Sequence, residues 1–253
     1  MAWPAILESF FTAFVGLVDS LMVSSMGAYA VAAVGLTTQP KFMGLSLFFA
    51  TNVSISALVA RRKGEDRRED ANRIFTTSIL FVTLMSVMIS VLLVAFADPI
   101  IRLCGSESTT HDGAVLYFRI IMGGMIFNVI QMCINAAQRG AGNTKITMRT
   151  NLVSNLVNIA ANYLLIQGRF GFPAMGIKGA ALATVLGTVV ACFMSIMSVR
   201  TSGTFVSIPY IINNKIKPGF DSSIFFIGFL GFWVFVCWLF KIKLNEMFVN
   251  FGD

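Results

Sequence analysis

The fold class is set by the stretch RTNLVSNLVNIAANYLLIQ, residues 149–167. It is apolar enough to span a bilayer, yet it carries asparagines at spacings of four, three and four, namely Asn151, Asn155, Asn158 and Asn162. At about 100° per residue these side chains share one stripe of a helix. Lipid cannot satisfy a carboxamide, so the stripe must face protein or water. The stretch therefore predicts a helix that lines a polar cavity within a membrane.

The composition also favours a membrane protein. Of the 253 residues, 56% are hydrophobic and 12% are charged, whereas soluble domains have roughly 25% charged residues. Apolar windows of about 20 residues, the length of a membrane-crossing helix, recur along the chain. We therefore predict an all-α polytopic membrane protein. Its expected spans are residues 3–23, 42–60, 74–97, 115–137, 149–167, 178–199 and 224–240.

The basic residues are concentrated in alternate loops. Twelve of the nineteen Lys and Arg side chains lie in residues 61–73, 139–149 and 200–217. The positive-inside rule places these loops, and the N-terminus with them, in the cytoplasm, as expected in the plasma (cytoplasmic) membrane. The net charge of +7 does not indicate a nucleic-acid partner, because acidic residues are interleaved with the densest basic run.

The sequence carries no signature of an enzyme or of a metal site. Its four cysteines are scattered without a C-x-x-C pair, which predicts neither a metal site nor a disulfide framework. His111, the only histidine, lies in an expected external loop, residues 98–114, without neighbouring ligands. Walker, G-x-G-x-x-G, H-E-x-x-H and G-x-S-x-G motifs are absent from the sequence. We expect a protein that is not an enzyme and that has no organic cofactor.

Asp19 lies inside the first predicted span, with GLV before it and SLMV after it. A charged side chain at the bilayer centre costs about 3 kcal/mol on insertion scales. The carboxylate must therefore be protonated, paired or bound to a cation, which is what a site for a coupling ion, H⁺ or Na⁺, requires. The alternative is a carboxylate that only reaches the external interface. Glu8 lies eleven residues earlier on the same helix face and is either a gate residue or an interfacial one.

Neutral oxygens can complete a cation shell around one carboxylate. Asn158 and Asn162, four residues apart, present two such oxygens on one helix face. Hydrogen bonding between helices is the alternative, but it is worth only ~0.6 kcal/mol on average in membranes. Further amides on three predicted spans indicate a bundle around a water-filled cavity, and the residues predicted to line it are Asn52, Gln131, Asn135 and Asn155.

An ordered set of short motifs runs from about Pro4 to Arg200. These are WPAILE (3–8), VDS (18–20), SALVAR (56–61), RGAGNTK (139–145), N-x-x-x-N (158–162) and GIKGAALAT (176–184). Each motif is weak alone, but their order and spacing across six spans are specific. The set resembles the N-terminal half, and only that half, of the multidrug and toxic compound extrusion (MATE) transporters of the MOP superfamily.

The resemblance implies an antiporter that exports organic cations and other drugs in exchange for H⁺ or Na⁺. It also implies that Asp19, Asn158, Asn162 and Thr184 form the coupling-ion site. Family members have about twelve helices in two lobes, and alternating access rocks one lobe against the other. This six-helix unit would therefore need a second lobe or a second copy as its partner.

We expect three regions along the chain. Residues 1–200 form the six-helix lobe, residues 201–221 a cytoplasmic linker, and residues 222–253 an atypical hydrophobic helix and tail. The last region is either a lipid-facing helix or the product of a truncation or a shifted reading frame. Two rivals to the antiporter lobe follow: a non-transporting truncated fragment, and a lipid-linked sugar flippase. The flippase would need basic residues inside the membrane to bind pyrophosphate, and the predicted spans hold almost none.

Overall fold

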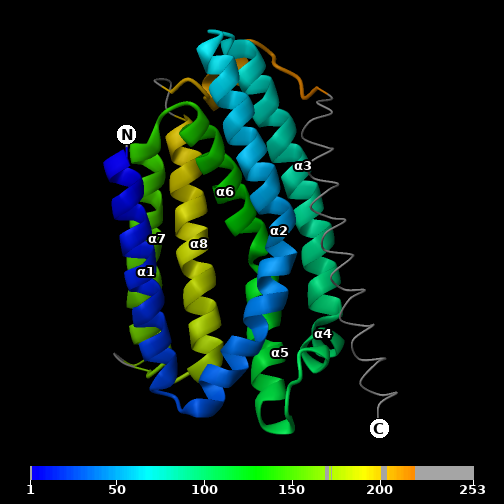
Figure 1. Cartoon of the computed structure of the whole chain (residues 1–253), viewed down its shortest axis with the longest axis vertical. Coiled ribbons are helices and arrows are strands. Elements are labelled where there is room, and N and C mark those ends of the chain that lie inside the picture. Colours follow the sequence, from blue (N-terminus) through cyan, green and yellow to red (C-terminus); the bar gives the residue numbers. More distant parts are fainter. Residues whose placement is uncertain (1, 169–170, 172, 201–203, 220–253) are drawn as a thin grey trace.

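The structure, a computed structural model, describes residues 2–168, 171, 173–200 and 204–219, with side chains described from residue 10 onward. Over these residues the chain forms helices and no strand (Figure 1). The helices are α1 (Ala2–Ser24), α2 (Ala28–Gly64), α3 (Arg68–Ala95), α4 (Ala97–Leu103), α5 (Ser108–Gly123), α6 (Met125–Gly140), α7 (Thr144–Leu165), α8 (Gly176–Arg200) and α9 (Ile208–Asn213). The predicted final span, residues 224–240, lies outside the described residues.

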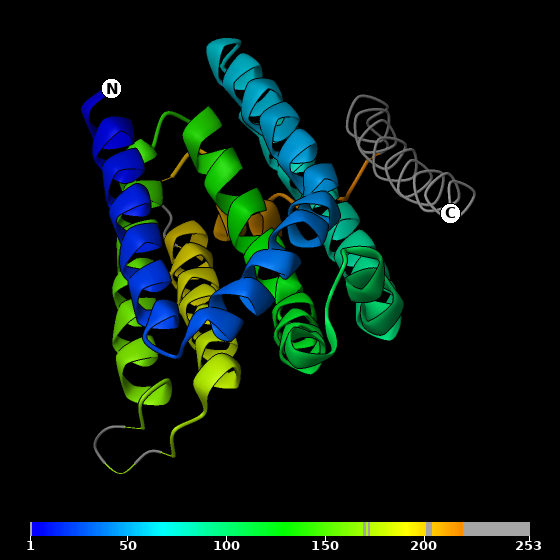
Figure 2. The ribbon, with the colours of Figure 1, turned by 60° about the horizontal axis from the view of Figure 1, so that its bottom comes forward.

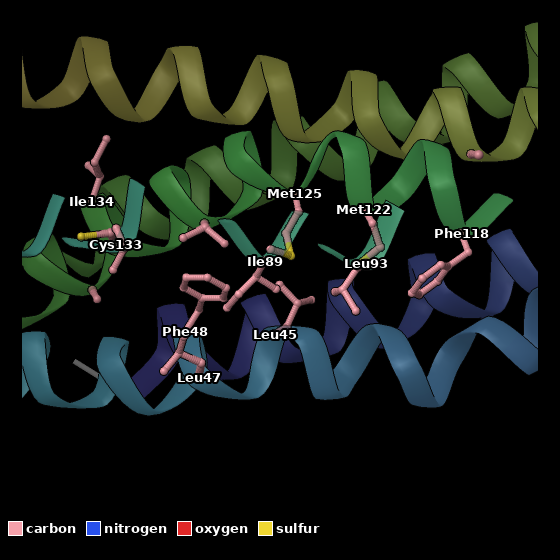
Figure 3. Close-up of a cluster of buried hydrophobic side chains, with 14 of the residues drawn as sticks. Leu45, Leu47, Phe48, Ile89, Leu93, Phe118, Met122, Met125, Cys133 and Ile134 are labelled. Carbon is pink, nitrogen blue, oxygen red and sulfur yellow. The ribbon is translucent and has the colours of Figure 1, made fainter. Parts of the chain in front are cut away.

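The long helices form one elongated bundle (Figure 1). Helices α1, α7 and α8 pack together on one side, and α2 packs with α3 on the other. Helices α5 and α6 lie between these groups and contact both. Apolar side chains such as Phe48, Phe118, Met122 and Met125 fill the space where α2 meets α5 and α6 (Figure 3). The polar helix α7 packs directly against α1 and α8.

Several helices are long and apolar enough to cross a membrane. Helices α2, α3 and α8 qualify singly, and α5 with α6 adds a fourth span if the pair, bent by 46°, is counted as one. Helix α7 has 22 residues, long enough to cross, but its asparagines reduce its apolar character. Over the described residues, the chain is an all-α polytopic membrane protein, as the sequence predicts.

Two predicted loops are helical in the structure. The connection expected before residue 42 is part of α2, which begins at Ala28 and holds the buried Pro40 within it. Ala, Val and Leu favour helix between Ala28 and Leu36, and a proline inside a helix bends it instead of ending it when packing supports both halves. Figure 2 shows α2 changing direction along its length. The expected loop 98–114 is shortened to residues 104–107 by α4 and α5.

The three basic loops meet at one end of the bundle. The Lys63 ammonium donates to the Ala141 carbonyl, which joins the α2–α3 turn to the α6–α7 turn. Arg68 Nη2 donates to the Thr204 carbonyl at 2.8 Å, which joins the start of α3 to the segment after α8. The loops thus share one side, as the charge pattern predicts; their cytoplasmic location stays a prediction.

Candidate functional site

Asp19 of α1 contacts α7 directly. Asn162 Nδ2 donates to Asp19 Oδ1 at 2.6 Å, and the Asn162 side chain is only 3% exposed. The side-chain amide oxygen of Asn162, Oδ1, is buried without a hydrogen-bond partner among the described residues. The structure therefore places a half-buried carboxylate beside an amide oxygen that is available to a ligand.

The amide of Asn158, one turn before Asn162, can be assigned with either its nitrogen or its oxygen toward Asp19, and its hydrogen-bond partners favour the nitrogen. With its nitrogen toward the carboxylate, it donates to Asp19 Oδ1 at 2.9 Å and Oδ2 at 3.1 Å, and its oxygen accepts from the Thr184 backbone N–H at 3.2 Å. With the amide reversed, its nitrogen donates to Thr184 Oγ1 at 3.3 Å and its oxygen accepts from Asn162 Nδ2 at 3.4 Å. The first orientation satisfies an ionised carboxylate, and the second turns an oxygen toward it.

Close packing of α7 on α8 fixes these distances. A Cβ added at Gly187 of α8 would lie 2.9 Å from the Ser154 carbonyl oxygen and 3.2 Å from Asn158 Cβ. The Ser154 hydroxyl donates to the Gly187 carbonyl at 2.9 Å. Only glycine permits this approach, which brings Thr184 beside Asn158.

The carboxylate opens onto a cavity of about 340 Å³ between α1, α2, α5, α7 and α8, here called the Asp19 cavity. Asn162 and Thr184 line it with Asp19. Two further lining residues, Lys41 of α2 and Tyr117 of α5, are not singled out by sequence reasoning. Tyr117 lines the cavity together with Thr184, and Lys41 interacts electrostatically with Asp19. Because Lys41 follows Pro40, it is typical of a loop residue in sequence and gives no signal of its place in a cavity.

A second cavity of about 680 Å³, the amide cavity, lies between α2, α6 and α7. Asn52, Gln131, Asn135 and Asn151 are among the residues that line it. Gln131 Nε2 donates to Asn151 Oδ1 at 2.9 Å. Asn135 Nδ2 lies 3.5 Å from the same oxygen. Asn155 does not line this cavity.

The asparagine stripe of α7 thus serves two sites. Asn158 and Asn162 face Asp19, whereas Asn151, two turns earlier, joins the amide cavity. The sequence predicts that the stripe lines a polar cavity, and the structure divides it between two, because Asn162 meets Asp19 of α1 and Asn151 meets Gln131 of α6. The proposed gate residue Glu8 falls in α1, and its side chain lies outside those the structure describes.

His111 is not isolated, contrary to the sequence-based interpretation. Its Nε2 lies 2.9 Å from Asp98 Oδ1, and its Nδ1 lies 2.7 Å from Ser106 Oγ. The hydrogen bond from His111 holds the pKa of the Asp98 carboxyl below its ordinary value of 3.8, and Arg102 adds to this effect. The helical turns of α4 and α5 create this cluster, which a loop would not.

The chemistry of the Asp19 cavity suits a monovalent cation. Asp19, Asn158, Asn162 and Thr184 together offer carboxylate, amide and hydroxyl oxygens, and oxygens are the ligands that hard cations prefer. Among the described residues, no three His, Cys, Asp or Glu side chains gather as a metal site would require. One carboxylate can balance a single positive charge, either that of a bound cation or that of Lys41, which lines the same cavity.

Membrane helices that enclose amides and a half-buried carboxylate around polar cavities are typical of transporters. The MatE family model matches residues 4–164, more than half of the chain. The chain therefore belongs to the MatE family, whose members are transporters and not enzymes.

Individual relatives agree. "Probable multidrug resistance protein YoeA" of Bacillus subtilis (strain 168) is 32% identical over 172 residues, which is 68% of this chain and 37% of that protein. "Multidrug resistance protein MdtK" of Yersinia enterocolitica is 28% identical over 189 residues, 75% of this chain and 41% of that protein. This chain therefore spans less than half the length of these relatives.

Solved structures give the same result. An outward-facing multidrug resistance MATE transporter of the MOP superfamily superposes with a TM-score of 0.79 at 25% identity, covering 90% of this chain and 49% of that one. A MOP superfamily transporter from Pyrococcus furiosus has a TM-score of 0.82 at 24% identity and shares the fold, covering 93% of this chain and 51% of that one.

Proposed function

We propose that this chain is one lobe of an antiporter that exports organic cations across the cytoplasmic membrane in exchange for H⁺ or Na⁺. The observation that carries the proposal is the 2.6 Å hydrogen bond between Asn162 and the Asp19 carboxylate at the wall of a cavity. Two relatives are named multidrug resistance proteins, which supports drug export as the activity of this lobe with its partner.

The Asn158 amide supplies a way to sense the coupling ion. An ionised, empty Asp19 favours the orientation in which Asn158 donates to it at 2.9 and 3.1 Å. A proton on Asp19, or a cation beside it, favours the reversed orientation, because an amide oxygen then accepts the proton or ligates the cation. Ion binding therefore changes the bond between Asn158 and Thr184, and with it the contact between α7 and α8.

The amide cavity is the proposed surface for the exported cation. Neutral amides and apolar side chains such as Phe49 and Val53 make up most of its lining and suit varied organic cations. Arg139, in the last turn of α6, is the charged residue among its described lining residues. Alternating access requires a second rigid body to close over such a surface. We propose that a second lobe or a second copy of this chain supplies that body.

The test is drug uptake into liposomes that contain the chain together with its partner lobe or copy. Asp19→Asn keeps the shape of the side chain and removes its charge, and we expect it to abolish transport of a fluorescent organic cation driven by a pH or Na⁺ gradient. The matched control is Asp112→Asn, which removes an exposed carboxylate of α5 that is not part of either cavity. Gradient-driven transport that survives in Asp19→Asn would reject Asp19 as the coupling group, and separate pH and Na⁺ gradients identify the ion.

A further inference from the structure

A third cavity lies at the end of the bundle where the basic loops meet. It has a volume of about 470 Å³ and lies between the end of α2, the start of α3, the α6–α7 turn and the segment after α8. We call it the basic cavity, and its lining includes Lys63, Arg68, Gln138, Asn143, Thr204 and Phe205. None of the described residues that line it is acidic.

Gln138 is the most informative residue of this cavity. Its side chain is fully buried, and neither its amide nitrogen nor its amide oxygen has a hydrogen-bond partner among the described residues. Leaving both halves of a buried amide unpaired destabilises a protein, so such groups generally mark an ion, a ligand or a water that the site holds. The Gln138 side chain therefore points to a polar occupant of the basic cavity.

The two cations retain unused donors. Lys63 donates to the Ala141 carbonyl, and Arg68 donates through Nε to the Phe205 carbonyl at 3.0 Å and through Nη2 to the Thr204 carbonyl at 2.8 Å. An ammonium has three N–H groups and a guanidinium has five, so both have donors beyond these contacts.

Helix α7 contributes further donors and a positive end. It begins after Asn143 without a side-chain hydrogen bond that caps its first turn. The first N–H groups of a helix lack intrahelical partners and favour anions. The basic cavity therefore combines two cations, an unpaired buried amide and the N-terminus of a 22-residue helix.

We propose that the basic cavity binds a phosphate group. A phosphate offers several acceptor oxygens and a negative charge, which matches the surplus of donors and the absence of carboxylates on the lining. Its source is either the headgroup of an anionic phospholipid or a soluble phosphate compound. This site is independent of ion coupling at Asp19.

The bound phosphate would lock the segment after α8 onto α3. Arg68 already stacks on Tyr210, with its guanidinium carbon 4.3 Å from the ring centroid. Asn72 donates to the Phe205 carbonyl at 3.1 Å and accepts from the Ser207 N–H at 3.0 Å. A ligand that bridges Lys63, Gln138 and Arg68 adds a charged link between these contacts and the α6–α7 turn.

The experiment titrates the purified full chain with two probes while its thermal unfolding is measured. One arm adds phosphatidylglycerol to the detergent micelles, with phosphatidylcholine as the reference, and the other adds inorganic phosphate. Hydrogen exchange of residues 204–213 is followed in parallel. We expect at least one arm to raise the unfolding midpoint in a saturable way and to slow exchange in that segment. A response to phosphatidylglycerol alone assigns the site to lipid, and a response to phosphate assigns it to soluble compounds.

Two variants and one control make the test specific. Lys63→Gln and Gln138→Leu should each weaken the apparent affinity about tenfold or more, because each removes a hydrogen bond to a charged group. In the absence of either probe, the unfolding midpoint of Gln138→Leu should be no lower than that of the parent protein, because the substitution also removes the unpaired buried amide. The control is Lys178→Gln, which removes an exposed charge near the start of α8, at the other end of that helix from Arg200.

Two outcomes overturn the proposal. One is the absence of a saturable response in both arms. The other is a response that Lys178→Gln weakens as much as Gln138→Leu does, because this would mean that net charge alone attracts the probe.

Discussion

Gly187→Ala tests whether the α7–α8 contact positions the ion site. The new Cβ would lie 2.9 Å from the Ser154 carbonyl oxygen, whereas ordinary contacts begin at 3.4 Å. The two nearest atoms, the Ser154 carbonyl oxygen and Asn158 Cβ, cannot rotate aside. Helix α7 must therefore move away from α8 by about 0.5 Å. Overpacking of this kind costs roughly 1–3 kcal/mol.

The expected result is a lower thermal midpoint in detergent. At about 2–4 °C per kcal/mol for a chain of this size, the midpoint should fall by roughly 2–12 °C. Coupling-ion affinity should fall as well, because the displaced backbone carries Asn158 away from Thr184 and Asp19. The matched control is Gly123→Ala, where the added Cβ meets nothing within 4 Å. Equal midpoints for the two variants, with unchanged ion affinity, would refute the reasoning.

Two further predictions concern charge and unpaired polarity. Asp98→Asn should destabilise the protein near neutral pH, because the pKa of Asp98 is lower in the folded state than its ordinary value of 3.8. The ionised Asp98 carboxylate therefore stabilises the folded protein above pH 3.8, and this stabilisation is lost as the pH falls through the folded-state pKa. Thermal midpoints across a pH series measure this, and a gap between the two proteins that stays constant down to the most acidic sample contradicts it. Asn52→Leu should leave the midpoint unchanged or raise it, because the buried Asn52 Oδ1 has no partner among the described residues. Organic-cation transport should nevertheless fall, and a variant that transports normally would remove Asn52 from the amide cavity's function.

The sequence predicts the site better than its surroundings. Asp19 and the Asn158–Asn162 pair are predictable because polar groups at helical spacing within an apolar segment have few explanations other than a polar cavity. Lys41 and Tyr117 are not predictable, because their place depends on how α2 bends and how α5 packs, which are properties of the assembled bundle.

The division of the α7 stripe shows the same limit. Periodicity places Asn151, Asn155, Asn158 and Asn162 on one face, but it does not state which neighbour each residue meets. Asn151 bonds to Gln131 on α6, whereas Asn162 bonds to Asp19 on α1. The basic cavity is equally hidden in the sequence, since Lys63, Gln138 and Thr204 come together only through tertiary packing.

Because the single helix α7 carries both the asparagines that face Asp19 and the one that bonds to Gln131, their movements are linked. Asn151 and Asn158 are two turns apart, a separation of about 10 Å along the axis. A rotation of α7 that moves Asn158 away from the Asp19 carboxylate must also move Asn151 away from Gln131. The proposed coupling of ion binding at Asp19 to the amide cavity would therefore need no chain of intermediate contacts, because the single helix α7 reaches both sites.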